Sequence, residues 1–223
     1  MVKILFGIMI AIALLLGGCS QEEDSQQPIS LEQSTDMKII VAVGDSLTAG
    51  QGVDESESYP ALLENRLQLA GYNYLVINAG VSGETSSGTL SRMEWIMTLE
   101  PDAIILETGA NDGLRGIDPG LVKDNFRQIL SFLEQKEVVV LLAGMKMVWN
   151  LGPEYVEKFN SIYPELAEEF GVVFMPFFLE GVAMNNSLNL ADGVHPNKQG
   201  YKMITDNIYP YVVEAIKRVE IHE

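Results

Sequence analysis

The chain has 223 residues, of which 47% are hydrophobic, and this is ample for one core. Its formal net charge of −17 weighs against a nucleic-acid partner, because an acidic surface repels phosphate backbones. The charge also weighs weakly against anionic membranes and highly charged substrates, although a local site can override the net field. A single cysteine, Cys19, excludes an intrachain disulfide.

Residues 1–18 have the build of a secretory signal. A lysine lies near the start, an unbroken apolar run extends from Ile4 to Leu16, and two glycines precede Cys19. The run is too short and wrongly flanked for a permanent membrane span. The ending "LGGC" resembles the lipobox of bacterial lipoproteins, which implies cleavage before Cys19 and lipidation of that cysteine. The alternative is an ordinary signal peptide with an incidental cysteine.

The lipobox resemblance implies a location in the cell envelope. The lipid would hold the protein on the outer side of the cytoplasmic membrane or in the outer membrane, so a membrane is an expected partner. Residues 19–37 are polar and acidic, with little to bury, and are expected to form a flexible tether. From residue 38 the pattern changes, and residues 38–223 are expected to form one domain without internal repeats.

Strand-like and helix-like segments alternate through that domain. Five short apolar runs without polar alternation suit strands buried on both faces, and they lie at residues 38–43, 74–79, 103–108, 138–144 and 172–177. Segments with helical spacing lie at residues 59–71, 86–100, 121–136, 154–171 and 198–219. This alternation predicts an α/β fold with a parallel sheet covered on both faces. Active crevices of such sheets lie at the carboxyl ends of the strands.

The first polar turn, within "VAVGDSLTAGQG" (residues 41–52), follows the first apolar run. Ser46 comes three residues after Val43, with glycines on either side of it that relieve a tight strand-to-helix turn. Ser46 is a candidate nucleophile, and the alternative is a helix N-cap. Asp45 is expected to brace the turn by hydrogen bonds and to take no part in the chemistry.

Two further polar loops supply candidate hydrogen-bond donors. Gly83 lies in a loop that leads into a helix, where unpaired amides are available to an oxyanion. Asn111 follows the third apolar run, and a side-chain amide can also donate to an oxyanion. Read alone, Gly83 can equally be a plain loop glycine and Asn111 part of an Asx-turn.

The last polar stretch, "LADGVHPNKQGYKMI" (residues 190–204), carries His195, with Asp192 three residues before it. In a compact loop this spacing lets the carboxylate reach Nδ1 of the imidazole and leaves Nε2 free to accept a serine proton. The alternative is a histidine packed at a loop–helix junction, and the other histidine, His222, is expected to be solvent-exposed. Together the four loops supply a nucleophile, two donors and an acid–base pair, which are the parts of acyl transfer.

These four loops resemble the sequence blocks of the GDSL, or SGNH, hydrolases. The blocks occur in the family order, as "GDSL" (44–47), "GVSGET" (80–85), "GAND" (109–112) and "DGVHP" (192–196). The resemblance covers roughly residues 38–219 and implies a three-layer α/β/α sandwich with a flavodoxin-like parallel sheet. It implies that Ser46 is the nucleophile, His195 the base and Asp192 its orienting carboxylate, with an oxyanion hole formed by Ser46, Gly83 and Asn111.

Within this family the chain is similar to bacterial thioesterases, arylesterases and lysophospholipases. The expected activity is hydrolysis of small-molecule acyl esters, lipid-like or aryl, through an acyl-serine intermediate, without a metal or organic cofactor. One alternative is a carbohydrate O-acetyl esterase of the cell envelope. Another, of a different class, is a non-catalytic envelope lipoprotein. The oligomeric state is left open.

The segment "GMKMVWNLGPEY" (residues 144–155) is unusually apolar for a loop beside the crevice. Methionine and aromatic side chains make adaptable apolar surfaces, so this segment is a candidate acyl groove. The alternative is that its side chains complete the core. The residues expected to line the groove are Met145, Met147, Trp149 and Leu151.

Overall fold

The structure is a computed structural model, and it describes residues 37–147 and 151–221. The expected signal peptide, Cys19 and nearly all of the expected tether lie outside the described residues, and so do Trp149 and His222. Within the described residues, no helix combines the length and the apolar character needed to cross a bilayer.

The sheet has five parallel strands in the order β2-β1-β3-β4-β5. Each predicted apolar run forms one of them; the first two strands extend one residue beyond the predicted runs, and the other three are shorter than predicted. The last strand is much shorter than the predicted run, since Pro176 has no N–H to continue the ladder. The strands are β1 (Lys38–Gly44), β2 (Tyr74–Gly80), β3 (Ala103–Glu107), β4 (Val139–Ala143) and β5 (Val173–Met175).

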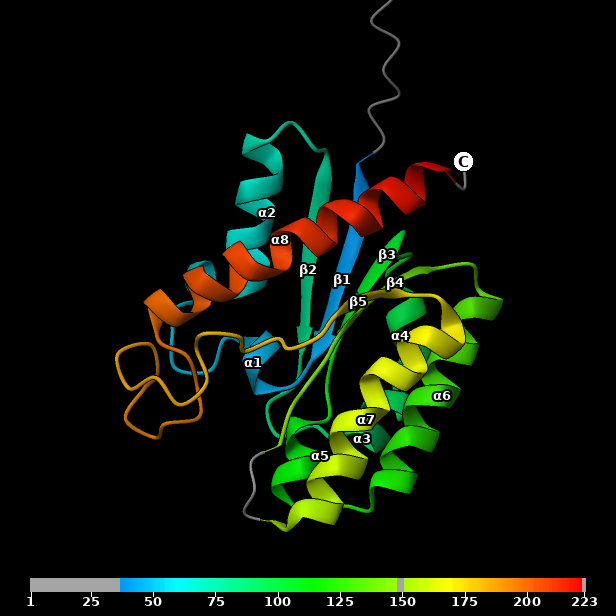
Figure 1. The fold of residues 1–223 in the computed structure, drawn as a ribbon. Coiled ribbons are helices and arrows are strands. Elements are labelled where there is room, and N and C mark those ends of the chain that lie inside the picture. Colours follow the sequence, from blue (N-terminus) through cyan, green and yellow to red (C-terminus); the bar gives the residue numbers. More distant parts are fainter. Residues whose placement is uncertain (1–36, 148–150, 222–223) are drawn as a thin grey trace, which may run out of the picture. The chain divides into compact units, whose positions relative to one another are not determined.

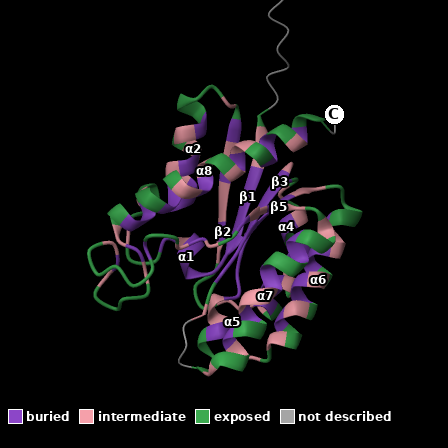
Figure 2. Cartoon of the chain, in the orientation of Figure 1, coloured by how far each residue is buried: buried purple, intermediate pink, exposed green. Residues whose placement is uncertain are grey.

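Helices cover both faces of the sheet, which confirms the predicted three-layer α/β/α architecture (Figure 1). On one face, α2 (Tyr59–Leu69) packs against α8 (Lys198–Ile221). On the other face, α6 (Pro119–Gln135) packs against α7 (Pro153–Phe170) and α3 (Ser86–Ser91). Central strands are buried along their length, whereas the helices expose the sides turned away from the sheet (Figure 2).

The prediction of a single helix over residues 86–100 is wrong in one respect, because the structure has two short helices there. After α3 the chain leaves helical geometry at Arg92 (φ −111°, ψ 7°), and α4 (Met93–Met97) follows. The guanidinium of Arg92 forms a paired contact with Glu84, at 2.7 Å from Nε to Oε1 and 2.6 Å from Nη2 to Oε2. Periodicity along the sequence does not reveal this tertiary pairing.

Three short helical turns connect the larger elements. They are α1 (Ser46–Ala49), the 3₁₀ turn η1 (Glu55–Glu57) and α5 (Ala110–Leu114). Gly44 of β1 pairs in register with both Gly80 of β2 and Glu107 of β3. The loops that follow these three strands therefore start side by side, and each carries one of the sequence blocks described above.

Candidate active site

Ser46 lies on a tight turn at the carboxyl end of β1. Asp45 caps the four-residue helix α1 by accepting a hydrogen bond from the Leu47 amide at 2.9 Å, and Ser46 is its first residue, 8% exposed. Gly44 is required for space, because a Cβ there would overlap Thr48 Oγ1 and the main-chain oxygen of Glu107. Asp45 is thus the N-cap and Ser46 the first residue of the helix, so the alternative that Ser46 itself is the N-cap is wrong.

A continuous set of hydrogen bonds joins Ser46, His195 and Asp192. His195 Nε2 lies 2.9 Å from Ser46 Oγ, and His195 Nδ1 lies 2.8 Å from Asp192 Oδ2. Nearly 150 residues of sequence separate the serine from the other two side chains. A carboxylate on Nδ1 holds the imidazole in the tautomer that can accept a hydroxyl proton at Nε2.

The loop that carries His195 is held largely by its own backbone. Asp192 Oδ1 accepts hydrogen bonds from the amides of Val194, at 2.9 Å, and His195, at 3.0 Å, and Gly193 adopts a φ of 71°. The backbone and side-chain hydrogen bonds of His195, together with the Val194 amide, lower the pKa of Asp192 to about 2. Asp192 is therefore ionised at neutral pH.

Gly83 and Asn111 lie in the loops after β2 and β3, beside the turn of Ser46. Gly83 has a φ of 81°, which strains any other residue, and its amide has no hydrogen-bond partner among the described residues. Asn111 Nδ2 donates to Asp45 Oδ2 at 3.0 Å, which leaves its second amide hydrogen available. These groups are placed at the edge of the sheet where the Ser46 hydroxyl lies.

Two carboxyl groups are buried beneath the nucleophile turn. Burial raises the pKa of Asp45 to about 6, against the lowering effect of its hydrogen bonds to Leu47 and Asn111. Glu107 is fully buried, and burial followed by the nearby charge of Asp45 raises its pKa well above the usual range. Thr48 Oγ1 donates to Glu107 Oε2 at 2.6 Å, whereas Oε1 has no hydrogen-bond partner among the described residues.

Sequence reasoning missed Glu107. It is the last residue of β3 and fell inside a run read only as a buried strand. The available signal was a carboxyl group at the carboxyl end of an otherwise apolar run, where a buried acid needs a partner.

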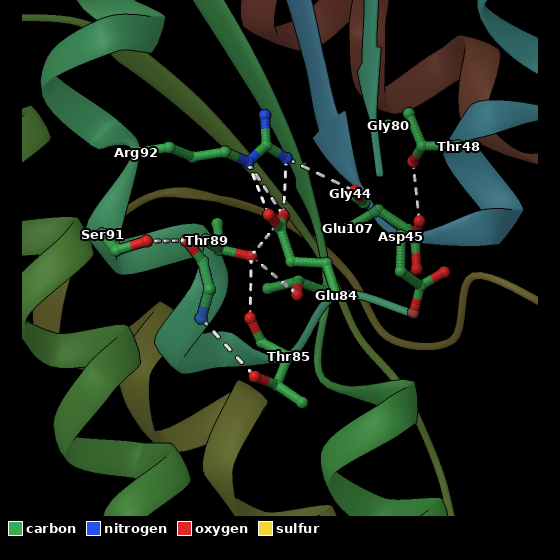
Figure 3. Close-up of polar contacts among 12 residues, drawn as sticks. Gly44, Asp45, Thr48, Gly80, Glu84, Thr85, Thr89, Ser91, Arg92 and Glu107 are labelled. Carbon is green, nitrogen blue, oxygen red and sulfur yellow. Dashed lines mark hydrogen bonds and ion pairs between the residues drawn. The ribbon is translucent and has the colours of Figure 1, made fainter. Parts of the chain in front are cut away.

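A second missed group, Glu84 with Arg92, ties the Gly83 loop to the end of β1 (Figure 3). Both side chains are largely buried, at 7% and 15% exposed. Arg92 Nη2 also reaches the Gly44 carbonyl at 3.4 Å, which accepts in addition from the Val81 amide at 2.9 Å. Glu84 is adjacent to Gly83, so this pair fixes the loop against the strand that carries Ser46.

A third missed group holds α5, and with it Asn111. The buried carboxylate of Asp112 accepts from the Ser86 amide at 2.8 Å and from the Ser86 hydroxyl at 2.6 Å. Asn125 Nδ2, on α6, donates to the same hydroxyl at 2.9 Å. The three side chains connect α5, α3 and α6 in the buried interior, which restrains the position of Asn111.

A pocket of about 230 Å³ opens beside Ser46 and His195. Its lining is mainly apolar and includes Leu47, Leu114, Met145, Met147, Phe177, Leu179, Met184 and Val194. Two of the predicted groove residues, Met145 and Met147, therefore face the site. Leu151 does not line this pocket and lies instead in a separate surface depression with Asp118 and Tyr155.

Among the described residues, no cluster of three or more His, Cys, Asp or Glu side chains is arranged to hold a metal ion. The polar groups at the site are instead those of a serine, an imidazole, a carboxylate and amide donors. This set can transfer an acyl group without a bound cofactor.

A family model described as GDSL-like Lipase/Acylhydrolase matches residues 42–203, which include the whole site. The chain belongs to this family. The predicted family and the predicted ester-hydrolase activity are confirmed. The "Esterase TesA" of Pseudomonas aeruginosa is 36% identical over 89% of this chain and 96% of its own length. The "Thioesterase 1/protease 1/lysophospholipase L1" of Escherichia coli is 37% identical over 75% of this chain and 79% of its own.

Solved structures of family members have the same fold. The crystal structure of TesA aligns with a TM-score of 0.77 at 36% identity, covering 80% of this chain and 99% of TesA. AlinE4, an esterase of the SGNH-hydrolase family, aligns with a TM-score of 0.68 at 40% identity, covering 81% of this chain and 97% of AlinE4. The described residues of this GDSL hydrolase thus have the SGNH fold.

Proposed function

We propose that this GDSL hydrolase cleaves esters of apolar, lipid-like acyl chains, with Ser46 as nucleophile, His195 as general base and Asp192 as the orienting carboxylate. One observation carries the assignment: the hydrogen bonds of 2.9 Å and 2.8 Å that join the three side chains. A structural serine does not need an imidazole within hydrogen-bond distance, and a structural histidine does not need an ionised carboxylate on its far nitrogen.

The reaction has two steps. Ser46 Oγ attacks the acyl carbon while His195 Nε2 takes its proton, and the imidazolium then protonates the leaving alcohol as the carbon–oxygen bond breaks. Water, activated by the same imidazole, attacks the acyl-serine and releases the acid. The oxyanion of each tetrahedral intermediate is stabilised by the amides of Ser46 and Gly83 and by the second amide hydrogen of Asn111.

The substrate class is supported by the pocket and by the names of the relatives. The pocket beside Ser46 is lined mainly by apolar side chains, which suits an acyl chain longer than acetyl. The relatives are described as an esterase, a thioesterase and lysophospholipase, and an arylesterase. We infer that medium-chain acyl esters of lysophospholipid or aryl type fit this pocket best.

Hydrolysis of p-nitrophenyl esters, from acetate to palmitate, tests both parts of the proposal. We expect a maximum at medium or long chains, and we expect Ser46→Ala to abolish turnover while the protein stays folded. Near-normal turnover in the variant would remove Ser46 from its role. Activity confined to acetate would instead favour deacetylation of carbohydrate. If no ester were hydrolysed in a Ser46-dependent way, the proposed activity would be contradicted and only the fold assignment would remain.

We also propose that residues 1–18 direct export and that Cys19 carries a lipid anchor, with residues 19–37 as the tether. The support is the apolar run followed by two glycines and the only cysteine. We expect Cys19→Ser to move the protein from the membrane fraction to the soluble fraction, measured by fractionation and immunoblotting. Unchanged membrane retention would contradict lipidation.

A further inference from the structure

Lys146 supplies a positive charge to the pocket beside Ser46. It follows β4 by three residues and lines the pocket together with Ser46 and His195. Among the described residues that line this pocket, it is the only lysine or arginine. Its neighbour Met145 is buried, whereas Lys146 is exposed, with Nζ 5.1 Å from the centre of the Phe177 ring. Lys146 therefore brings a positive charge to the solvent side of a mainly apolar pocket.

Lys146 forms no ion pair within the part of the chain that the structure describes. Acidic side chains are abundant in this chain, which has a net charge of −17. Many of the other basic side chains are paired with carboxylates: Arg66, Arg92, Lys123, Arg127, Lys158, Lys198 and Arg218. An unpaired cation at the mouth of the active-site pocket is available to a ligand.

We propose that Lys146 selects esters whose alcohol part carries an anionic oxygen group, a phosphate or a carboxylate. This inference rests on the proposed function of the site and names the chemistry of the leaving group. The acyl chain is uncharged and occupies the apolar lining, so a negative charge on the substrate belongs to the alcohol part. Lys146 offsets, at this one place, the repulsion that the acidic surface exerts on such a substrate.

The contact with Phe177 does not by itself account for Lys146, and the molecule contains an internal control. Lys136 is also exposed, lacks an ion pair among the described residues, and lies over a half-buried ring, with Nζ 5.7 Å from the centre of Phe132. It follows α6 and does not line the pocket. Substituting Lys136 therefore removes one positive charge and one cation–π contact without touching the active site.

The test compares kcat/KM for matched esters that differ in charge. One pair is 1-octanoylglycerol and its 3-phosphate. The other is o-nitrophenyl octanoate and 3-octanoyloxy-4-nitrobenzoate, which have the nitro group ortho to the ester oxygen in both cases. We expect Lys146→Met to lower the ratio of anionic to neutral kcat/KM by about three- to tenfold, Lys146→Glu to lower it further, and Lys146→Arg to preserve it. Lys136→Met should leave the ratio unchanged, and added salt should shrink the difference in this ratio between the wild type and Lys146→Met.

An unchanged ratio in Lys146→Met, or an equal fall in Lys136→Met, would overturn the proposal. A fall for the phosphate pair alone identifies a phosphate as the recognised group, and a fall for the nitrobenzoate pair alone identifies a carboxylate. Failure of the proposed function looks different, because no ester of either pair would then be hydrolysed in a Ser46-dependent way. Binding of 1-octanoylglycerol 3-phosphate to Ser46→Ala, measured by calorimetry with and without Lys146→Met, tests the recognition independently of turnover.

Discussion

The two halves of the proposed triad are held in different ways. Ser46 lies on a turn anchored from below by the sheet, with Asp45 only 1% exposed and Glu107 fully buried beside it. Asp192 and His195 lie on a loop outside the sheet, where the Asp192 side chain is 45% exposed and its main partners are amides within three residues. The Ser46 turn depends on buried contacts with residues distant in the sequence, whereas the Asp192–His195 loop is held by contacts within four consecutive residues.

The two halves are therefore expected to respond differently to substitution. A change beneath Ser46 removes buried contacts and is expected to reduce stability and rate together. A change in the Asp192 loop removes exposed, local contacts and is expected to reduce the rate with little loss of stability.

Asp192→Asn should separate rate from stability most strongly. The amide oxygen can still accept the backbone hydrogen bonds, but the charge that stabilises the imidazolium and fixes its tautomer is lost. We expect kcat for a p-nitrophenyl ester to fall by about 10³- to 10⁴-fold, with a small change in Tm. Asp124→Asn, which removes an exposed carboxylate paired with Arg127, is the matched control. A loss of kcat below tenfold would contradict the orienting role.

Glu107→Ala should damage the buried half. It leaves the Thr48 hydroxyl without its acceptor and creates a cavity beneath the nucleophile turn, so we expect a loss of about 3–4 kcal/mol in the free energy of unfolding, measured by urea denaturation. Glu107→Gln retains the shape and one oxygen acceptor and should stay within about 1 kcal/mol. Equal losses in both variants would show that the negative charge of Glu107, and not its shape, is what the site needs.

Asp45→Asn should change the pH dependence of stability. The pKa of Asp45 is raised by burial from 3.8 to about 6, so the folded state binds the proton more tightly than the unfolded state. Proton binding at Asp45 therefore adds to the free energy of unfolding. This contribution is fully present below pH 3.8 and is lost as the pH rises through 6. Between pH 4 and 8, the free energy of unfolding of the wild type should therefore fall by about 2–3 kcal/mol relative to that of Asp45→Asn.

Urea midpoints across that pH range measure the effect of Asp45, with Asp206→Asn, at an exposed aspartate paired with Arg66, as the control. Parallel curves for wild type and Asp45→Asn would show that Asp45 is not held in a desolvated position. If the wild type instead loses stability relative to Asp45→Asn as the pH falls from 8 to 4, then the hydrogen bonds of Asp45 lower its pKa more than burial raises it.

Much of the fold was predictable because its signals are local. Apolar runs without alternation marked all five strands, and helical periodicity marked the large helices. The helix over residues 86–100 was predicted as continuous because its periodicity does not mark the break at Arg92, whose guanidinium contacts Glu84 outside the helix. Leu151 was expected in the pocket because apolar character says nothing of the direction in which a loop turns.

The chain's own sequence determined the α/β alternation, the tight turn at Ser46 and the Asp192–His195 spacing, since each depends on residues within a few positions of one another. Only the tertiary structure decided that Ser46 Oγ and His195 Nε2 lie 2.9 Å apart, that Glu107 is buried beneath the nucleophile turn, and that Lys146 lines the pocket without an acidic partner among the described residues. The physical reason is that burial, desolvation and pairing depend on segments brought together by the sheet register, which local sequence patterns do not encode.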